Sequence, residues 1–158
     1  MINLPQNGIT AAWGRAMVAY LGGDPSPIAD DWCWSDFAQQ YPKLREPFEC
    51  YIARATPDNP GMPEAAQGMC EDFHSSREWA ETQIERAIPD NHGMPKAAHW
   101  MFADCGSSRE WAEAQIERAT PDNPGLPEAA QVMCEYCGSS REWAESQIER
   151  ANGFVPSV

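Results

Sequence analysis

The feature that most constrains this chain is a block of residues that occurs three times in succession without a gap. Residues 57–88, 89–120 and 121–152 align over 32 positions, and the first and third blocks are identical at 25 of them. A repeat of this length is typical of proteins in which copies of one supersecondary unit stack on one another. The sequence therefore predicts a repeat architecture for the C-terminal two-thirds of the chain.

The N-terminal third contains a weaker copy of the same block. Ile52 and the stretch from Arg54 to Gly61 fall on the 32-residue period, so we interpret residues 25–56 as a degenerate first repeat. Residues 1–24 contain a separate predicted helix, which Gly22-Gly23 would end. The 158 residues are treated as one domain with a short tail at 153–158. The apolar side of the first helix is predicted to carry Ile9, Trp13, Ala16, Met17 and Tyr20.

Each full block divides into two predicted helices. The first begins at a proline, Pro63 in residues 57–88, because proline suits the first helical turn. The second begins in the sequence Ser-Ser-Arg-Glu, where Ser75 and Glu78 match a capping box. A Pro-Asp-Asn-x-Gly segment opens each block and separates its helices from those of the block before.

Stacking would bury apolar faces that one short helix pair cannot bury alone. Trp79, Trp111 and Trp143 are expected in the core, because each indole brings roughly 150–250 Å² of surface to bury. The predicted fold class is all-α, a solenoid-like stack of two-helix repeats with an extra N-terminal helix. The Asp58-x-x-Gly61 spacing, followed by proline and two alanines, is similar to that of ankyrin repeats. The Thr-Pro-Leu-His stretch is missing and the period is one residue short, so we assign no family.

The chain is strongly acidic, with a net charge of −13 from 24 acidic and 11 basic residues. Such a chain is repelled by phosphates and anionic lipids, so we expect no direct nucleic-acid or membrane binding and a partner with a neutral or basic surface. No apolar run reaches the roughly 20 residues of a membrane-spanning helix, and the N-terminus lacks a secretory pattern. We therefore expect a cytoplasmic protein whose six cysteines are mostly reduced.

Three cysteines raise the question of a metal site. Cys134 and Cys137 have the Cys-x-x-Cys spacing of zinc sites, and Cys105 would extend the cluster. The equivalent positions of other blocks hold Phe102 and Phe73, which favours core sites that cysteine fills as a small apolar residue. We therefore predict no cofactor and keep a zinc-binding structural or regulatory protein as an alternative.

Catalysis has little support in the sequence. None of the three histidines recurs in the repeat, and the paired serines are explained by capping. Neither a Gly-rich phosphate loop, a His-Glu-x-x-His pattern nor a nucleophile elbow occurs in the sequence. We predict that the protein is not an enzyme, and an enzyme of unknown type is the third reading.

Repeated glutamates follow one side of the second helix of each block. Stacked helices would lay these rows side by side as a negative surface, which either keeps the protein soluble or imitates nucleic-acid phosphates against a basic partner. We include them among the predicted partner-binding residues. The rows consist of Glu78, Glu81, Glu85, Glu110, Glu113, Glu117, Glu142, Glu145 and Glu149.

The middle block departs from the other two at four neighbouring places, His92, Lys96, His99 and Trp100. Lys96, His99 and Trp100 follow the i, i+3, i+4 rule, so they share one face of the first helix of the block. An exposed tryptophan beside a cation is typical of a binding hot spot, although drift or packing under the N-terminal helix would also explain it. We predict that these four residues contact a partner.

The last block has the same apolar stripe as the internal ones, although solenoids usually finish with a polar cap. Either the tail residues Phe154-Val155 cover this stripe, or a second copy of the chain covers it in a homodimer through the C-terminal repeat. We predict a non-enzymatic interaction module that binds and blocks or scaffolds a partner protein. A sharper version is an inhibitor of a nucleic-acid-handling complex, an anti-defence protein of the nucleic-acid-mimic type, and it rests on charge and size alone.

Overall fold

The computed structural model describes residues 11–153, and within this range the chain is all-helical, with nine α-helices, one short 3-10 helix and no strand. The helices are α1 (Ala11–Tyr20), α2 (Trp34–Gln40), the 3-10 helix η1 (Pro42–Leu44), α3 (Arg45–Ala53), α4 (Met62–Asp72), α5 (Arg77–Glu85), α6 (Met94–Cys105), α7 (Arg109–Glu117), α8 (Leu126–Cys137) and α9 (Arg141–Ala151).

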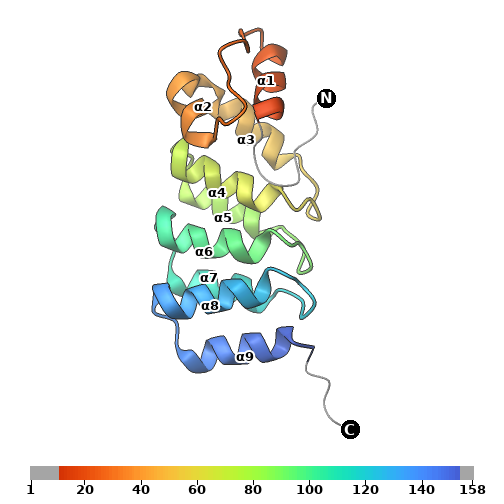
Figure 1. Ribbon diagram of the computed structural model, residues 1–158, viewed down its shortest axis with the longest axis vertical. Coiled ribbons are helices and arrows are strands. Elements are labelled where there is room, and N and C mark those ends of the chain that lie inside the picture. Colours follow the sequence, from red (N-terminus) through yellow and green to blue (C-terminus); the bar gives the residue numbers. More distant parts are fainter. Residues whose placement is uncertain (1–10, 154–158) are drawn as a thin grey trace.

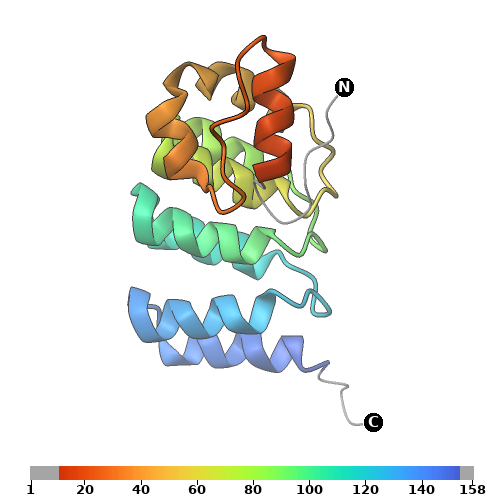
Figure 2. The ribbon, with the colours of Figure 1, turned by 45° about the horizontal axis from the view of Figure 1, so that its top comes forward.

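The helices of the three full blocks form pairs that follow one another along the long axis of the molecule (Figure 1). The pairs are α4 with α5, α6 with α7, and α8 with α9, and α1 to α3 lie together at one end. The first helices of the pairs, α4, α6 and α8, follow one another on one side of the molecule, and the second helices lie behind them (Figure 2). Because α4 packs on α6 and α6 on α8, residues of neighbouring blocks form one continuous surface.

The segment between helix pairs connects neighbouring blocks as well as separating them. The side-chain oxygen of Asn91 accepts a hydrogen bond from Gly93, and its nitrogen donates to the carbonyls of Pro57 and Asn59 at 3.0 and 2.9 Å. Asn123 makes the same contacts one block later. A buried asparagine therefore satisfies the polar backbone of two successive loops.

The predicted capping box is wrong by one residue. Ser76, not Ser75, is the N-cap of α5, and its hydroxyl oxygen accepts a hydrogen bond from the backbone N–H of Trp79 at 3.0 Å. Glu78 therefore stands at the second helical position and not at the third, from which a capping box would reach back. The predicted proline is confirmed in the first turn of α4, which begins one residue earlier at Met62.

The predicted end of α1 is confirmed, and part of its predicted buried face is wrong. Gly22 adopts a φ of 83°, and the backbone N–H of Gly23 bonds to the carbonyl of Val18, a helix-ending arrangement. Ala16 and Tyr20 are exposed, whereas Gly14 and Val18 are buried. Gly14 is needed there because an added Cβ would lie 2.1 Å from the Phe37 ring. The predicted Ile9 lies outside the described residues.

In the helix pairs the core consists mainly of alanine, methionine and isoleucine side chains from both helices, such as Ala66, Met69 and Ile84. Trp79, Trp111 and Trp143 are only partly buried and pack against the edge of this core, which corrects their predicted place inside it. The physical reason is their polar Nε1 atom, which in Trp111 and Trp143 reaches a glutamate at the surface. None of the helices within residues 11–153 is both long and apolar enough to cross a membrane.

Candidate functional site

A groove with a volume of about 630 Å³ lies between α6 and α8, the first helices of two successive pairs. Aromatic and apolar side chains form much of its lining, and two large aromatic residues at its edge, Trp100 and Tyr136, are 39% and 79% exposed. Binding sites in proteins are typically concave and apolar with a few polar groups. The groove is lined by His92, Lys96, His99, Trp100, Phe102, Ala103, Gly125, Glu128, Ala129, Val132, Tyr136 and Cys137.

The structure brings all four predicted residues of the middle block to this groove. His92, Lys96 and Trp100 are exposed, so their side chains are accessible from solvent. His99 is only 7% exposed, so it differs from the other three residues, whose side chains are open to solvent. The reason is the packing of α8 against α6, which covers the flank of α6 that carries His99 while Trp100 stays outside.

Burial lowers the pKa of His99, because the charged imidazolium loses hydration. The carboxylates of Asp104 and Glu128 oppose this effect, and the ammonium of Lys96 adds to it. At neutral pH the imidazole is therefore uncharged and contributes to the apolar lining of the groove. The ring of His99 lies 4.8 Å from that of Trp100, centroid to centroid.

The sequence analysis missed the residues that α8 contributes to the groove, most of all Tyr136. A signal was present, because Tyr136 stands where the other two full blocks have Asp72 and Asp104. Comparison of the last block with the others, position by position, would have singled it out. That Tyr136 and Trp100 lie at the same groove is visible only once α6 and α8 are placed side by side.

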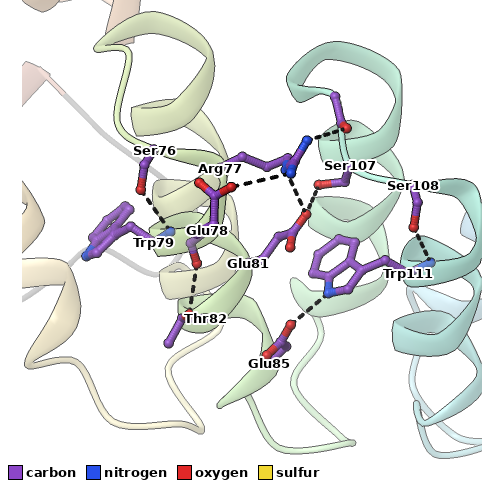
Figure 3. Close-up of polar contacts among 11 residues, drawn as sticks. Ser76, Arg77, Glu78, Trp79, Glu81, Thr82, Glu85, Ser107, Ser108 and Trp111 are labelled. Carbon is purple, nitrogen blue, oxygen red and sulfur yellow. Dashed lines mark hydrogen bonds and ion pairs between the residues drawn. The ribbon is translucent and has the colours of Figure 1, made fainter.

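The glutamate rows lie on the second helices of the pairs, and several members bind the next block (Figure 3). The Ser107 hydroxyl donates to Glu81 Oε2 at 2.6 Å, and Ser139 donates to Glu113 at 2.6 Å. The side chains of Glu81 and Glu113 are 20% and 23% exposed, in contrast to 60% for Glu145, after which no block follows in the described chain. These carboxylates hold successive blocks together.

A second set of glutamates in the rows binds the repeated tryptophans. Trp111 Nε1 donates to Glu85 at 2.8 Å, and Trp143 Nε1 donates to Glu117 at 3.0 Å (Figure 3 shows the first pair). The other five members of the rows make no hydrogen bond to another block within residues 11–153. They are Glu78, Glu110, Glu142, Glu145 and Glu149, and all five are exposed, as are Glu85 and Glu117. Only Glu81 and Glu113 are partly covered, so most of the negative surface stays open to solvent.

The cysteines named as metal ligands are partly buried free thiols in α6 and α8. Within the part of the chain that the structure describes, no group of three or more His, Cys, Asp or Glu residues is placed to hold a metal ion. Cys105 lies beside Cys70 of the preceding block, and its pKa is raised by the hydrogen bond between the two thiols and by burial, so it remains a thiol.

Comparisons with known proteins assign no family. No protein-family model matches the chain, and neither curated proteins nor solved structures include a significant match.

Proposed function

We propose that this protein is a helical-repeat solenoid that works as a non-enzymatic interaction module, which binds a partner protein and blocks or scaffolds it. The α6/α8 groove is the contact surface. The observation that carries this proposal is the pair of exposed aromatic residues, Trp100 and Tyr136, at the edge of one apolar groove. A few large aromatic side chains supply most of the binding energy in many protein interfaces.

A comparison of equivalent positions in the three full blocks also supports the α6/α8 groove as the contact surface. The residue at the place of Trp100 is Gly68 in the preceding block and Val132 in the following one. Neither the helix nor its packing needs a tryptophan there, because the repeat forms without one twice. A side chain that the fold does not require, and that solvent can reach, is available for binding.

The partner is a protein with a basic surface. The net charge of −13 steers a basic partner toward this chain and repels nucleic acid itself. Inhibition of a nucleic-acid-handling complex is the narrower form of this proposal. It is supported by the charge and by the exposed carboxylates of Glu78, Glu110 and Glu142, while the glutamates engaged between blocks give it no support.

The test is to capture partners from a lysate of the source organism with the unchanged chain and with the variant Trp100→Val. Valine is chosen because the following block has Val132 at this position. We expect the substitution to weaken capture about tenfold or more, at low and at high salt alike. Tyr20→Ala is the matched control, because Tyr20 is 63% exposed and lies on α1, away from the groove. Its capture should equal that of the unchanged chain.

The salt dependence separates the two forms of the proposal. Capture of a nucleic-acid-binding complex that is lost at high salt supports inhibition by charge, because screening removes exposed ion pairs. Capture that resists salt and is lost in Trp100→Val supports the groove. Capture that neither salt nor this substitution changes contradicts the proposed contact surface.

A further inference from the structure

A second groove, of about 410 Å³, lies on the other flank of α6, where the start of α2 meets α4. Trp100 borders both grooves, so the two form neighbouring parts of one face. This second groove differs in character from the first, because it combines tryptophans with carboxylates. We name it the Trp/acid groove and define it by Trp32, Trp34, Glu64, Glu71, Trp100 and Asp104.

The side chains of Trp32 and Trp34, which line the groove, are held in place by contacts with other aromatic residues and with α4. The Trp34 ring lies against Gly68 of α4, where an added Cβ would be 2.5 Å from ring atoms Cδ1 and Nε1. Edge-to-face contacts with Phe48 and Phe73, at centroid distances of 5.8 and 6.1 Å, fix the same ring. Trp32 contacts Phe37 in the same manner at 5.2 Å. The indoles therefore present preformed surfaces, and binding costs little side-chain entropy.

The charge of the groove is unbalanced. Four carboxylates line it, and the only cation in its lining is Lys96. Glu64 and Asp104 make no hydrogen bond or ion pair within residues 11–153, and Glu71 accepts only from the Gln67 amide, at 2.6 Å. The pKa of Asp72 is raised by burial and by the neighbouring Glu71, and His74 opposes this shift. A positive group in the groove would relieve this repulsion.

We propose that the Trp/acid groove binds an arginine side chain of a basic partner. A guanidinium stacks on the face of an indole and presents N–H groups that match carboxylate oxygens, so one side chain satisfies both features of the groove. The proposal rests on the proposed function, since it names the chemistry by which a basic partner is recognised on this face. It adds a specific anchor beside the apolar contact at the α6/α8 groove.

The test measures binding of a fluorescently labelled oligoarginine peptide to the full chain by anisotropy, at about 0.15 M salt, where exposed charges more than about 8 Å apart are screened. The groove variant combines Glu71→Gln with Asp104→Asn. The charge-matched control combines Asp90→Asn with Asp122→Asn, which removes the same charge from exposed positions in the loops that open the second and third full blocks. We expect about tenfold weaker binding for the groove variant and less than about twofold for the control.

Further arms test the aromatic part and the choice of arginine. Trp32→Leu should weaken the oligoarginine complex severalfold, and oligolysine should bind the unchanged chain severalfold less tightly, because ammonium does not stack as guanidinium does. Equal weakening by the groove variant and its control would reduce the effect to net charge and overturn the proposal. Equal affinity for the two peptides, or the lack of saturable binding, would overturn it as well.

The outcome separates this inference from the proposed function. Lysate capture that is lost in Trp100→Val but unchanged in the groove variant overturns the arginine site and leaves the interaction module standing. Tyr136 lines the α6/α8 groove and not the Trp/acid groove, so Tyr136→Asp, which restores the residue of the other two full blocks, tests the first groove alone. Peptide binding that is lost in the groove variant, together with lysate capture unaffected by Tyr136→Asp, supports the arginine site and contradicts the contact at the α6/α8 groove.

Discussion

The guanidinium of Arg118 lies at the end of α5 in the preceding helix pair, where its Nη2 donates a hydrogen bond to the carbonyl oxygen of Ile84 at 2.9 Å. Its Nη1 donates to the carbonyl of Ala87 at 2.7 Å. The last carbonyls of a helix have no partner within the helix, and they carry the negative end of its dipole. Each full block thus places an arginine that caps the second helix of the block before it, and Arg86 and Arg150 repeat the contact.

Loss of this arginine should destabilise the chain. We expect Arg118→Ala to lower the free energy of unfolding by about 2 kcal/mol, because two charge-assisted hydrogen bonds to half-buried carbonyls are lost. Urea denaturation followed by circular dichroism measures the change. Arg54→Ala is the matched control, since Arg54 occupies the same position of the degenerate block, is exposed, and has a guanidinium that donates no hydrogen bond in the described chain and lies 6.0 Å from the centroid of the Tyr51 ring. It should change stability by no more than about 0.5 kcal/mol, and equal losses would show that the cap is unimportant.

His74 should be replaceable by glycine with a gain in stability. His74 has a φ of 61°, and the same position in the next two blocks holds Gly106 and Gly138, with φ of 81° and 80°. A side chain in the left-handed region costs about 1 kcal/mol, so His74→Gly should raise the unfolding free energy by up to that amount. The reverse substitution, Gly106→His, should lower it. Thermal melts of both variants check the two signs, and a loss of stability in His74→Gly would contradict the prediction.

The stability of the chain should fall in mild acid because of His99. Its pKa is lowered by burial in the folded state, so the unfolded chain binds the proton first as the pH falls below about 6.5. The folded state therefore loses stability as the pH falls from the pKa of His99 in the unfolded chain to its lower pKa in the folded chain. Outside this pH range, the contribution of His99 to the unfolding free energy does not change with pH. The matched variant is His99→Gln, the residue of both sister blocks, and its stability should show a weaker dependence on pH from 7 to 5 when measured by denaturant titration. Identical pH dependence of the two chains would show that another group is responsible.

Homodimerisation through the C-terminal repeat remains a prediction, and α9 shows where it would occur. Ile84 and Ile116 are fully buried by the block that follows each of them, whereas Ile148 at the same position of the last block is only partly buried. We expect light scattering to show a dimer that forms as concentration rises and is lost in Ile148→Asn. Ile88→Asn is the control, because Ile88 lies exposed in a loop between blocks. A monomer at every concentration would contradict the prediction. The tail residues Phe154-Val155, which we predict as the alternative way of covering the apolar stripe of the last block, lie outside the described residues.

Much of the local structure could be predicted from the sequence. The repeat period placed two helices in every full block, and the prolines marked the start of α4 and its copies within one residue. The same comparison of blocks selected Lys96 and Trp100, which line the α6/α8 groove. These features depend on residues close together in the chain or on differences between copies, and both can be read in a linear sequence.

The sequence alone could not separate the glutamates that bind the next block from those that make no bond to it. Glu81 and Glu78 are three residues apart on the same helix, yet Glu81 binds Ser107 of the next block and Glu78 is exposed. Likewise, His99 and Trp100 are neighbours in the chain and differ in burial because α8 packs over one flank of α6.

The sequence by itself determined that the chain is helical, where its helix pairs begin and which positions depart from the repeat, because these follow from periodicity and from the residues that start and end helices. Only the tertiary structure decided which carboxylates are engaged, that Tyr136 joins Trp100 at one groove, and that Trp34 meets Gly68 beside a set of acidic side chains. The physical reason is that these contacts join residues from about 25 to more than 35 positions apart, and their geometry depends on how one helix pair packs on the next.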